Sequence, residues 1–181
     1  MSSTIVVDEP AEVTARTSRR MAVLFTALRI FTGLVWFSNG IAKLISKGNY
    51  DWGFISFNLI TRDAAKGIAT NAANKSQIGF LSSIYKDLVV ANWGFFGIFL
   101  MIVELAIGLG LIFGVATRLA AIGGLLLLTP IWLMLLHTGR YLWEYPAEDL
   151  FPLLLLALVP AGRVFGVDRK LAARFNYRWP F

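Results

Sequence analysis

Two ionisable residues stand inside long apolar stretches of this sequence. Glu104 lies near the middle of the segment Ala91–Phe113. Arg29 lies within the segment Met21–Leu44. A charged residue at the centre of a bilayer costs roughly 2.5–3.5 kcal/mol, so each is expected to face the protein interior and to have a partner. At 1.5 Å per residue, Arg29 would lie about 12 Å and Glu104 about 14 Å from the same membrane surface. The sequence therefore predicts a buried Arg29–Glu104 ion pair.

This pair has two interpretations. It can fix which helix faces meet, or it can belong to a proton relay or a ligand site. The architectural role is favoured, because arginine stays charged in proteins and is a poor proton carrier.

A second group of polar residues gathers where apolar segments begin or end. Lys43 closes the first segment, His137 closes the third, and Asp149 opens the fourth. Together they could bind a quinone headgroup, with His137 donating to a carbonyl oxygen and Asp149 setting the imidazole tautomer. Ordinary interfacial residues and helix caps have the same composition, so both interpretations remain. The predicted quinone site comprises Trp36, Asn39, Lys43, His137, Trp143 and Asp149, with His137 and Asp149 as the catalytic candidates.

The elements that would position these residues are membrane helices. The chain is 57% hydrophobic and 15% charged, against an average of about 25% charged in soluble domains. A crossing needs ~20 apolar residues. The sequence predicts four spans, at residues 21–44, 91–113, 119–138 and 149–165. The short joint Gly114–Arg118 requires an antiparallel hairpin between the second and third spans.

The remaining segments are predicted to lie outside the membrane. Residues 1–20 are expected to form a flexible tail, and residues 169–181 a basic C-terminal tail. Residues 45–90 form an insertion with an amphipathic helix, because Ile78, Leu81, Tyr85 and Leu88 recur at helical spacing. Lysine and arginine near the short segments place both termini in the cytoplasm and the insertion outside, in a plasma-membrane protein. The predicted fold is an all-α, antiparallel four-transmembrane-helix bundle.

The first span carries a distinctive face. Steps of three and four residues put one group on the same side of a helix, and this side is expected to point inward. The group is Arg29, Gly33, Trp36, Gly40 and Lys43. Small residues at Ala106, Gly110 and Gly114 would let helices approach closely inside the bundle or, alternatively, in a homo-oligomer.

Composition excludes several kinds of chemistry. The sequence has no cysteine, which rules out disulfides, thiol catalysis and thiolate metal sites, and its single histidine cannot supply both axial ligands of a haem. We expect no metal site and no intrinsic cofactor. The net charge of +6 arises from cations beside apolar segments, which favours lipid headgroups over nucleic acid as partners. Arg118, directly after the predicted hairpin, is a candidate for binding a lipid phosphate.

Three stretches resemble the DoxX/DoxD-like family of membrane proteins: LRIFTGLVWFSNGIAKL (Leu28–Leu44), ELAIGLGLIFGVATRLAAIGG (Glu104–Gly124) and GRVFGVD (Gly162–Asp168). The resemblance implies a four-helix membrane bundle and a link to respiratory or sulfur redox chemistry. One relative is the membrane subunit of thiosulfate:quinone oxidoreductase. The large insertion after the first span departs from the compact family pattern.

Two functions follow as expectations. The first is a membrane subunit of a quinone-linked oxidoreductase, which takes electrons from an envelope redox partner because the chain has no redox centre of its own. The second is a non-catalytic accessory subunit that binds lipid or stabilises a larger membrane complex. A transporter is a weaker third, since four spans are few.

Overall fold

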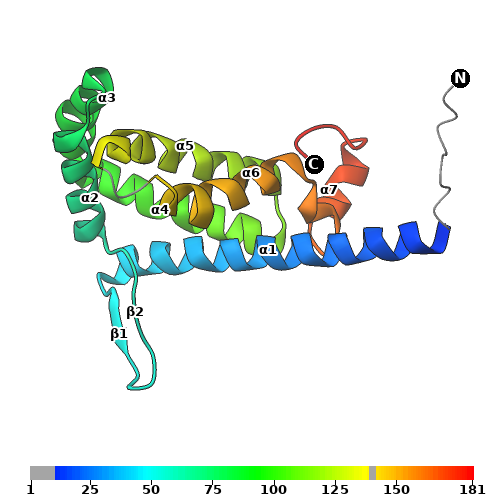
Figure 1. The fold of residues 1–181 in the computed structure, drawn as a ribbon. Helices are drawn as coiled ribbons and strands as arrows, with labels where there is room; N and C mark the ends of the chain where they lie inside the picture. Colours follow the sequence, from blue (N-terminus) through cyan, green and yellow to red (C-terminus); the bar gives the residue numbers. More distant parts are fainter. Residues whose placement is uncertain (1–10, 139–141) are drawn as a thin grey trace, which may run out of the picture.

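The computed structural model describes residues 11–138 and 142–181, and it is mostly helical, at 77%. Figure 1 shows the arrangement of its elements. In chain order they are α1 (Ala11–Ile45), β1 (Asn49–Asp51), β2 (Ser56–Asn58), α2 (Arg62–Lys75), α3 (Gly79–Ser83), the π-helix η1 (Ile84–Val90), α4 (Trp93–Phe113), α5 (Thr117–Leu135), the 3-10 turn η2 (Leu136–Thr138), the π-helix η3 (Pro146–Leu150), α6 (Phe151–Leu158), the 3-10 turn η4 (Ala161–Arg163) and α7 (Asp168–Arg174).

Helices α1, α4, α5 and α6 pack against one another to form the body of the molecule (Figure 1). The helices α1, α4 and α5 are long and apolar enough to cross a membrane. Large apolar side chains on their outer faces are exposed, as lipid-facing residues are: Phe31, Leu34, Phe95, Ile102 and Leu126. The structure thus agrees with the prediction of a mostly helical membrane protein.

The helix in the fourth predicted span, residues 149–165, is shorter than expected and is not among the described helices that are long and apolar enough to cross a membrane. Helix α6 and the π-helical turn η3 before it cover residues 146–158, which is about 20 Å at 1.5 Å per residue. Helix α6 ends because Val159 precedes Pro160 and has extended backbone angles, the conformation that a following proline favours. Pro152 is tolerated because it lies in the first turn of α6.

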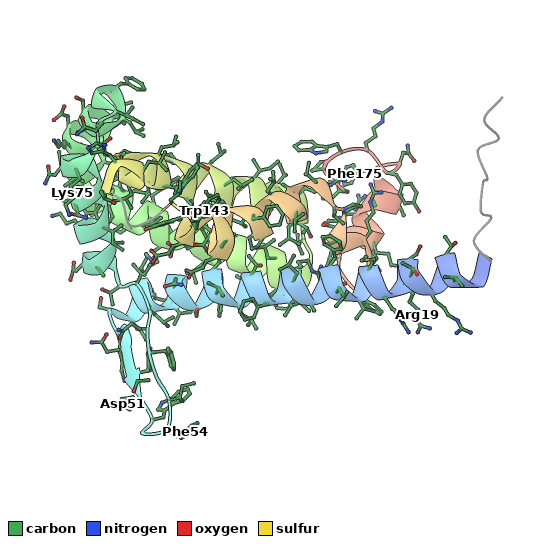
Figure 2. The ribbon with its side chains drawn as sticks, viewed as in Figure 1. Arg19, Asp51, Phe54, Lys75, Trp143 and Phe175 are labelled. Atoms are coloured by element: carbon green, nitrogen blue, oxygen red, sulfur yellow. The ribbon has the colours of Figure 1, made fainter. Side chains whose placement is uncertain are left out.

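The first helix is longer than expected. It begins at Ala11, so residues 11–20, predicted as a flexible tail, are helical, while residues 1–10 lie outside the described part. No proline or glycine interrupts the chain between residue 11 and Gly33. In Figure 1, the N-terminal part of α1 extends well beyond the other helices, and Arg19 is labelled on this extension in Figure 2.

The inward face predicted for α1 is confirmed. Arg29 is 0% exposed, Trp36 6% and Lys43 2%. Glycines bring α1 and α4 into close contact: a Cβ on Gly108 would lie 2.6 Å from the backbone nitrogen of Phe37, and one on Gly33 would lie 2.8 Å from that of Ile112. Any larger residue at either position would force the helices apart.

Between α1 and α4, the chain forms a cap over one end of the bundle, consisting of α2, α3 and η1 (residues 62–90). Helix α2 was not predicted. Its N-terminus is capped by the Thr61 hydroxyl, which accepts from the Ala64 N–H at 3.3 Å. Its buried face consists of Ala65, Ala69, Ala72 and Ala73.

The predicted amphipathic helix corresponds to α3 and η1. Leu81 and Tyr85 pack against the core beside Met134 and Leu135, whereas Ile78 and Leu88 are exposed. Only half of the predicted apolar stripe is therefore used for packing.

A small β-hairpin is the main departure from an all-α fold. Strands β1 and β2 pair antiparallel, with Tyr50 opposite Phe57, and the hairpin points away from the helices, as the labelled Asp51 and Phe54 in Figure 2 show. The Asp51 carboxylate accepts from the Gly53 N–H and the Ser56 hydroxyl, both at 2.9 Å. These two hydrogen bonds lower the pKa of Asp51 and close the turn.

We refer to the end of the bundle under the cap as the cap end. The opposite end, which holds the α4–α5 turn and α7, is the terminal end. The basic C-terminal segment does not form a free tail there. Residues 168–174 are helical, the Arg163 guanidinium donates to the Phe181 carbonyl, and the Phe175 and Phe181 rings stack at 5.2 Å.

Candidate functional site

An ion pair between α1 and α4 lies at the cap end. Lys43 Nζ is 2.8 Å from Glu104 Oε2, and the two side chains are 1% and 12% exposed. Lys43 also donates to the Ile60 carbonyl oxygen at 2.9 Å. The same peptide segment is held by Asn39, whose Oδ1 accepts from the Ile60 N–H at 2.8 Å. Lys43 thus connects the wall of the bundle to the chain entering the cap.

This pairing corrects the predicted Arg29–Glu104 ion pair. Gly40 packs on Leu105, so Glu104 lies near the C-terminal end of α1, and Arg29 lies about 16 Å away along that helix. The depth estimate placed the membrane surface at Met21. In the structure the α4–α5 turn is level with Arg29, because Arg29 touches Gly114.

The Lys43–Glu104 pair forms part of the wall of a cavity of about 290 Å³. Helices α1, α4 and α5 form its sides, the cap and η3 close it, and most of its lining is apolar. The residues are Trp36, Lys43, Ile60, Ala65, Ile68, Ala69, Tyr85, Val89, Trp93, Phe96, Phe99, Leu100, Glu104, Leu127, Leu128, Ile131, Tyr145 and Asp149. We call this cavity the cap-end pocket.

Polar atoms in the cap-end pocket are few and well defined. The indole nitrogens of Trp36 and Trp93 are buried and have no hydrogen-bond partner within the described residues. A buried N–H without an acceptor is unfavourable, and a ligand oxygen in the pocket would satisfy it. With Lys43, the two tryptophans are the lining residues that carry these donors, and a Cβ on Gly97 would lie 2.9 Å from Trp93 Nε1.

Two π-helical segments meet at this pocket. Tyr85 and Val89 come from η1, and Asp149 comes from η3. π-helical turns inside helices are frequent at functional sites, because they redirect side chains. Burial raises the pKa of Tyr85, which lies in the cap.

The structure brings together half of the predicted quinone site. Trp36, Lys43 and Asp149 line the cap-end pocket. Asn39 is used to hold Ile60 and does not line it.

The other two predicted residues also lie outside the lining. His137 is exposed in the 3-10 turn that follows α5, and Trp143 is 74% exposed. The helix loses its regular geometry after Leu135, so the side chain of His137 does not follow the inward face of α5. Arg140 and Tyr141, between His137 and Trp143 in the sequence, lie outside the described residues.

Sequence reasoning missed several pocket residues. Trp93 was not among the predicted site residues, but it is 9% exposed and packs against Ala65 and Ala69 of α2. Tyr85 was visible in the amphipathic stripe, although its contact with the pocket depends on the fold of the cap. Glu104 was identified as a buried acid, but with the wrong partner.

A second buried charge cluster occupies the terminal end. Arg29 donates through Nη2 to the Phe165 carbonyl at 3.2 Å, while its Nε and Nη1 have no hydrogen-bond partner within the described residues. Asp168 is 3% exposed and accepts from the Ala116 and Thr117 N–H groups at 2.7 and 2.9 Å. Asp168 therefore caps the start of α5, where the backbone donors lack helical partners.

The guanidinium of Arg29 fits closely between two glycines. A Cβ on Gly114 would lie 1.6 Å from Arg29 Nη1, and one on Gly166 would lie 2.4 Å from it. The space around Arg29 is filled by backbone, unlike the space beside Lys43.

The remaining predicted cation, Arg118, donates through Nη2 to the Leu158 carbonyl at 3.0 Å. It therefore ties α5 to the end of α6, and its predicted contact with lipid stays a prediction. Across residues 11–138 and 142–181, no group of three or more His, Asp or Glu side chains is placed to hold a metal ion.

Comparisons of the chain with known protein families, curated proteins and solved structures identify no similar protein. No family model matches the chain, and no curated protein or solved structure matches it.

Proposed function

We propose that this protein is a membrane subunit that binds a quinone in the cap-end pocket and works with a partner redox protein. The observation that carries the proposal is the apolar cavity of about 290 Å³ with a lysine–glutamate pair in its wall. Small-molecule sites are typically apolar cavities with a few placed polar groups. The resemblance to DoxX-like proteins points to the same class of ligand.

The residues present fit a flat ring with carbonyl oxygens. Trp36, Trp93 and Phe96 line the pocket with aromatic surface. The two unpartnered indole N–H groups and the Lys43 ammonium are donors for carbonyl oxygens. Aromatic faces and N–H donors of this kind orient a planar ligand by stacking and by hydrogen bonding.

A quinone supplies the capacity to accept two electrons and two protons. Lys43 would hold one carbonyl oxygen and favour negative charge there, and Glu104 and Asp149 are acids in the pocket wall that could pass protons to ring oxygens. Because the sequence has no cysteine and one histidine, the electrons would come from the partner.

The proposed topology has four crossings, with η3 and α6 forming a short fourth, in the plasma membrane. Both termini would lie in the cytoplasm. Cations support this, because Arg16, Arg19 and Arg20 lie on the extension of α1 and Arg169, Lys170 and Arg174 on α7, which is the side where lysine and arginine accumulate.

The experiment is native mass spectrometry of protein extracted gently from its own membrane, followed by binding of a short-chain ubiquinone analogue to the purified protein, measured by tryptophan fluorescence. Lys43→Met should weaken binding by more than tenfold. Lys75→Met, on the exposed face of α2 (Figure 2), is the control for loss of a positive charge. Equal affinities for both variants would contradict the assignment of this pocket.

The β-hairpin favours a second function, that of a non-catalytic accessory subunit. Phe54 is 91% and Trp52 61% exposed at its tip, and the hairpin points away from the bundle (Figure 2). Exposed apolar patches of this kind mark contacts with lipid or other proteins. If replacing Trp52 and Phe54 by serine dissociates a larger membrane complex while the quinone analogue still binds, the hairpin serves assembly independently of the pocket.

A further inference from the structure

An open cleft at the terminal end combines aromatic and basic side chains. Its volume is about 420 Å³. Phe113 and Phe165, which are 59% and 76% exposed, line it together with Gly166, Val167, Arg169 and Lys170. Phe113 is the last residue of α4, so the cleft begins where the apolar outer surface of that helix ends.

The backbone presents Phe165 to this cleft in an unusual conformation. Its φ is 52°, a left-handed value that is uncommon for residues other than glycine. The buried Arg29 donates to the Phe165 carbonyl. After Gly166, the Val167 and Asp168 N–H groups donate to the Phe113 and Gly114 carbonyls at 3.1 and 2.8 Å. The segment is thus fixed on both sides, and the exposed ring of Phe165 is displayed by a rigid backbone.

The acid nearest to the two cations of the cleft, Asp168, forms its hydrogen bonds elsewhere. Arg169 and Lys170 are exposed at the start of α7. Asp168, directly before them, is buried, and its two oxygens accept from the backbone of residues 116 and 117. The buried Arg29 lies directly behind Gly166, and its own side chain does not line the cleft.

We infer that this cleft binds an anionic phospholipid. Its phosphate would lie between Arg169 and Lys170, and its acyl chains would run along Phe165 and Phe113 onto the outer surface of α4. Both halves of the ligand are needed to account for the cleft, because a soluble anion would contact the two cations and not the two phenylalanines. The inference is independent of the quinone proposal, since the cap-end pocket lies at the opposite end of the bundle.

The test measures binding of phosphatidylglycerol and of phosphatidylcholine to the purified full-length protein by native mass spectrometry. The Arg169→Gln/Lys170→Gln variant should lose about 30-fold in affinity for phosphatidylglycerol, because each cation near a membrane surface contributes about 1 kcal/mol. Its affinity for phosphatidylcholine should not change. The matched control is Arg174→Gln/Arg178→Gln, which removes the same charge from exposed residues outside the cleft.

Two further measurements separate the alternatives. Phe165→Ser should weaken binding of phosphatidylglycerol while leaving any binding of glycerol phosphate unchanged. Glycerol phosphate that binds as tightly as the lipid would overturn the lipid assignment in favour of a soluble phosphate. Equal losses in the two charge variants would also overturn it, because they would indicate general attraction to a basic surface. Circular dichroism and the unfolding temperature identify variants that fail to fold.

Discussion

Helix α1 buries a cation at each end of the bundle, and the two cations have different surroundings. Arg29 lies between Gly114 and Gly166, with no space for even a Cβ. Lys43 lies in the wall of a cavity and faces a carboxylate, Glu104, in the same wall. A buried charge enclosed by backbone can only hold the fold together, whereas one beside open apolar space is available to a ligand. Burial of a charged side chain therefore does not by itself show whether its role is structural or functional. The presence of a cavity beside the side chain separates the two roles.

The largest expected effect tests the close packing around Arg29. Gly114→Val should destabilise the protein by about 3–5 kcal/mol, because the side chain would collide with the guanidinium and because φ is 66° at this residue. The free energy of unfolding in mixed micelles measures it. Gly67→Ala is the control: apart from its chain neighbours and the backbone of its own helix, no atom lies within 4 Å of the added Cβ, and the substitution should stabilise by about 0.5–1 kcal/mol. A mild effect of Gly114→Val would show that the terminal end has room to adapt.

The second prediction separates stability from binding at the cap end. Lys43→Met leaves Glu104 buried without its partner and should cost about 3 kcal/mol. In the Lys43→Met/Glu104→Gln double variant most of that stability should return, measured by the same unfolding experiment, while binding of the quinone analogue stays lost. Recovery of both properties together would mean that the pair is architectural, like the cluster at the terminal end.

The smallest effect concerns the unpartnered indole of Trp93. Trp93→Phe removes an N–H that has no acceptor within the described residues, so the free energy of unfolding should change by less than about 1 kcal/mol. Binding of the quinone analogue should nevertheless weaken by about fivefold, since one hydrogen bond to the ligand is worth about 1 kcal/mol. Unchanged affinity would remove Trp93 from the set of ligand donors.

The inward face of α1 could be predicted because helical periodicity alone determines it. The register of α1 against α4 could not, since it depends on how Gly33 meets Ile112 and Gly40 meets Leu105. The pairing of Glu104 follows from that register, and a count of residues from an assumed membrane surface therefore assigned the wrong cation.

The insertion between α1 and α4 was the hardest region to predict. The buried face of helix α2 consists of alanines. Alanine is only weakly hydrophobic, so the sequence of this segment shows almost no periodic pattern of apolar residues. The hairpin had a local signal, because Tyr50 and Phe57 each stand between polar residues and Gly53 supplies the positive φ of the turn. The cap-end pocket depends on these elements folding over the bundle, and so only its residues on α1, together with Asp149, could be identified in advance.

The Ile60 peptide is held at both of its ends, its N–H by Asn39 and its carbonyl by Lys43. Lys43, one of the groups that a ligand would contact, therefore also holds the Ile60 segment in the wall of the pocket. A ligand oxygen that attracted the Lys43 ammonium would weaken its hydrogen bond to the Ile60 carbonyl. In the proposed site, a bound ligand and the Ile60 carbonyl would therefore compete for the same lysine ammonium.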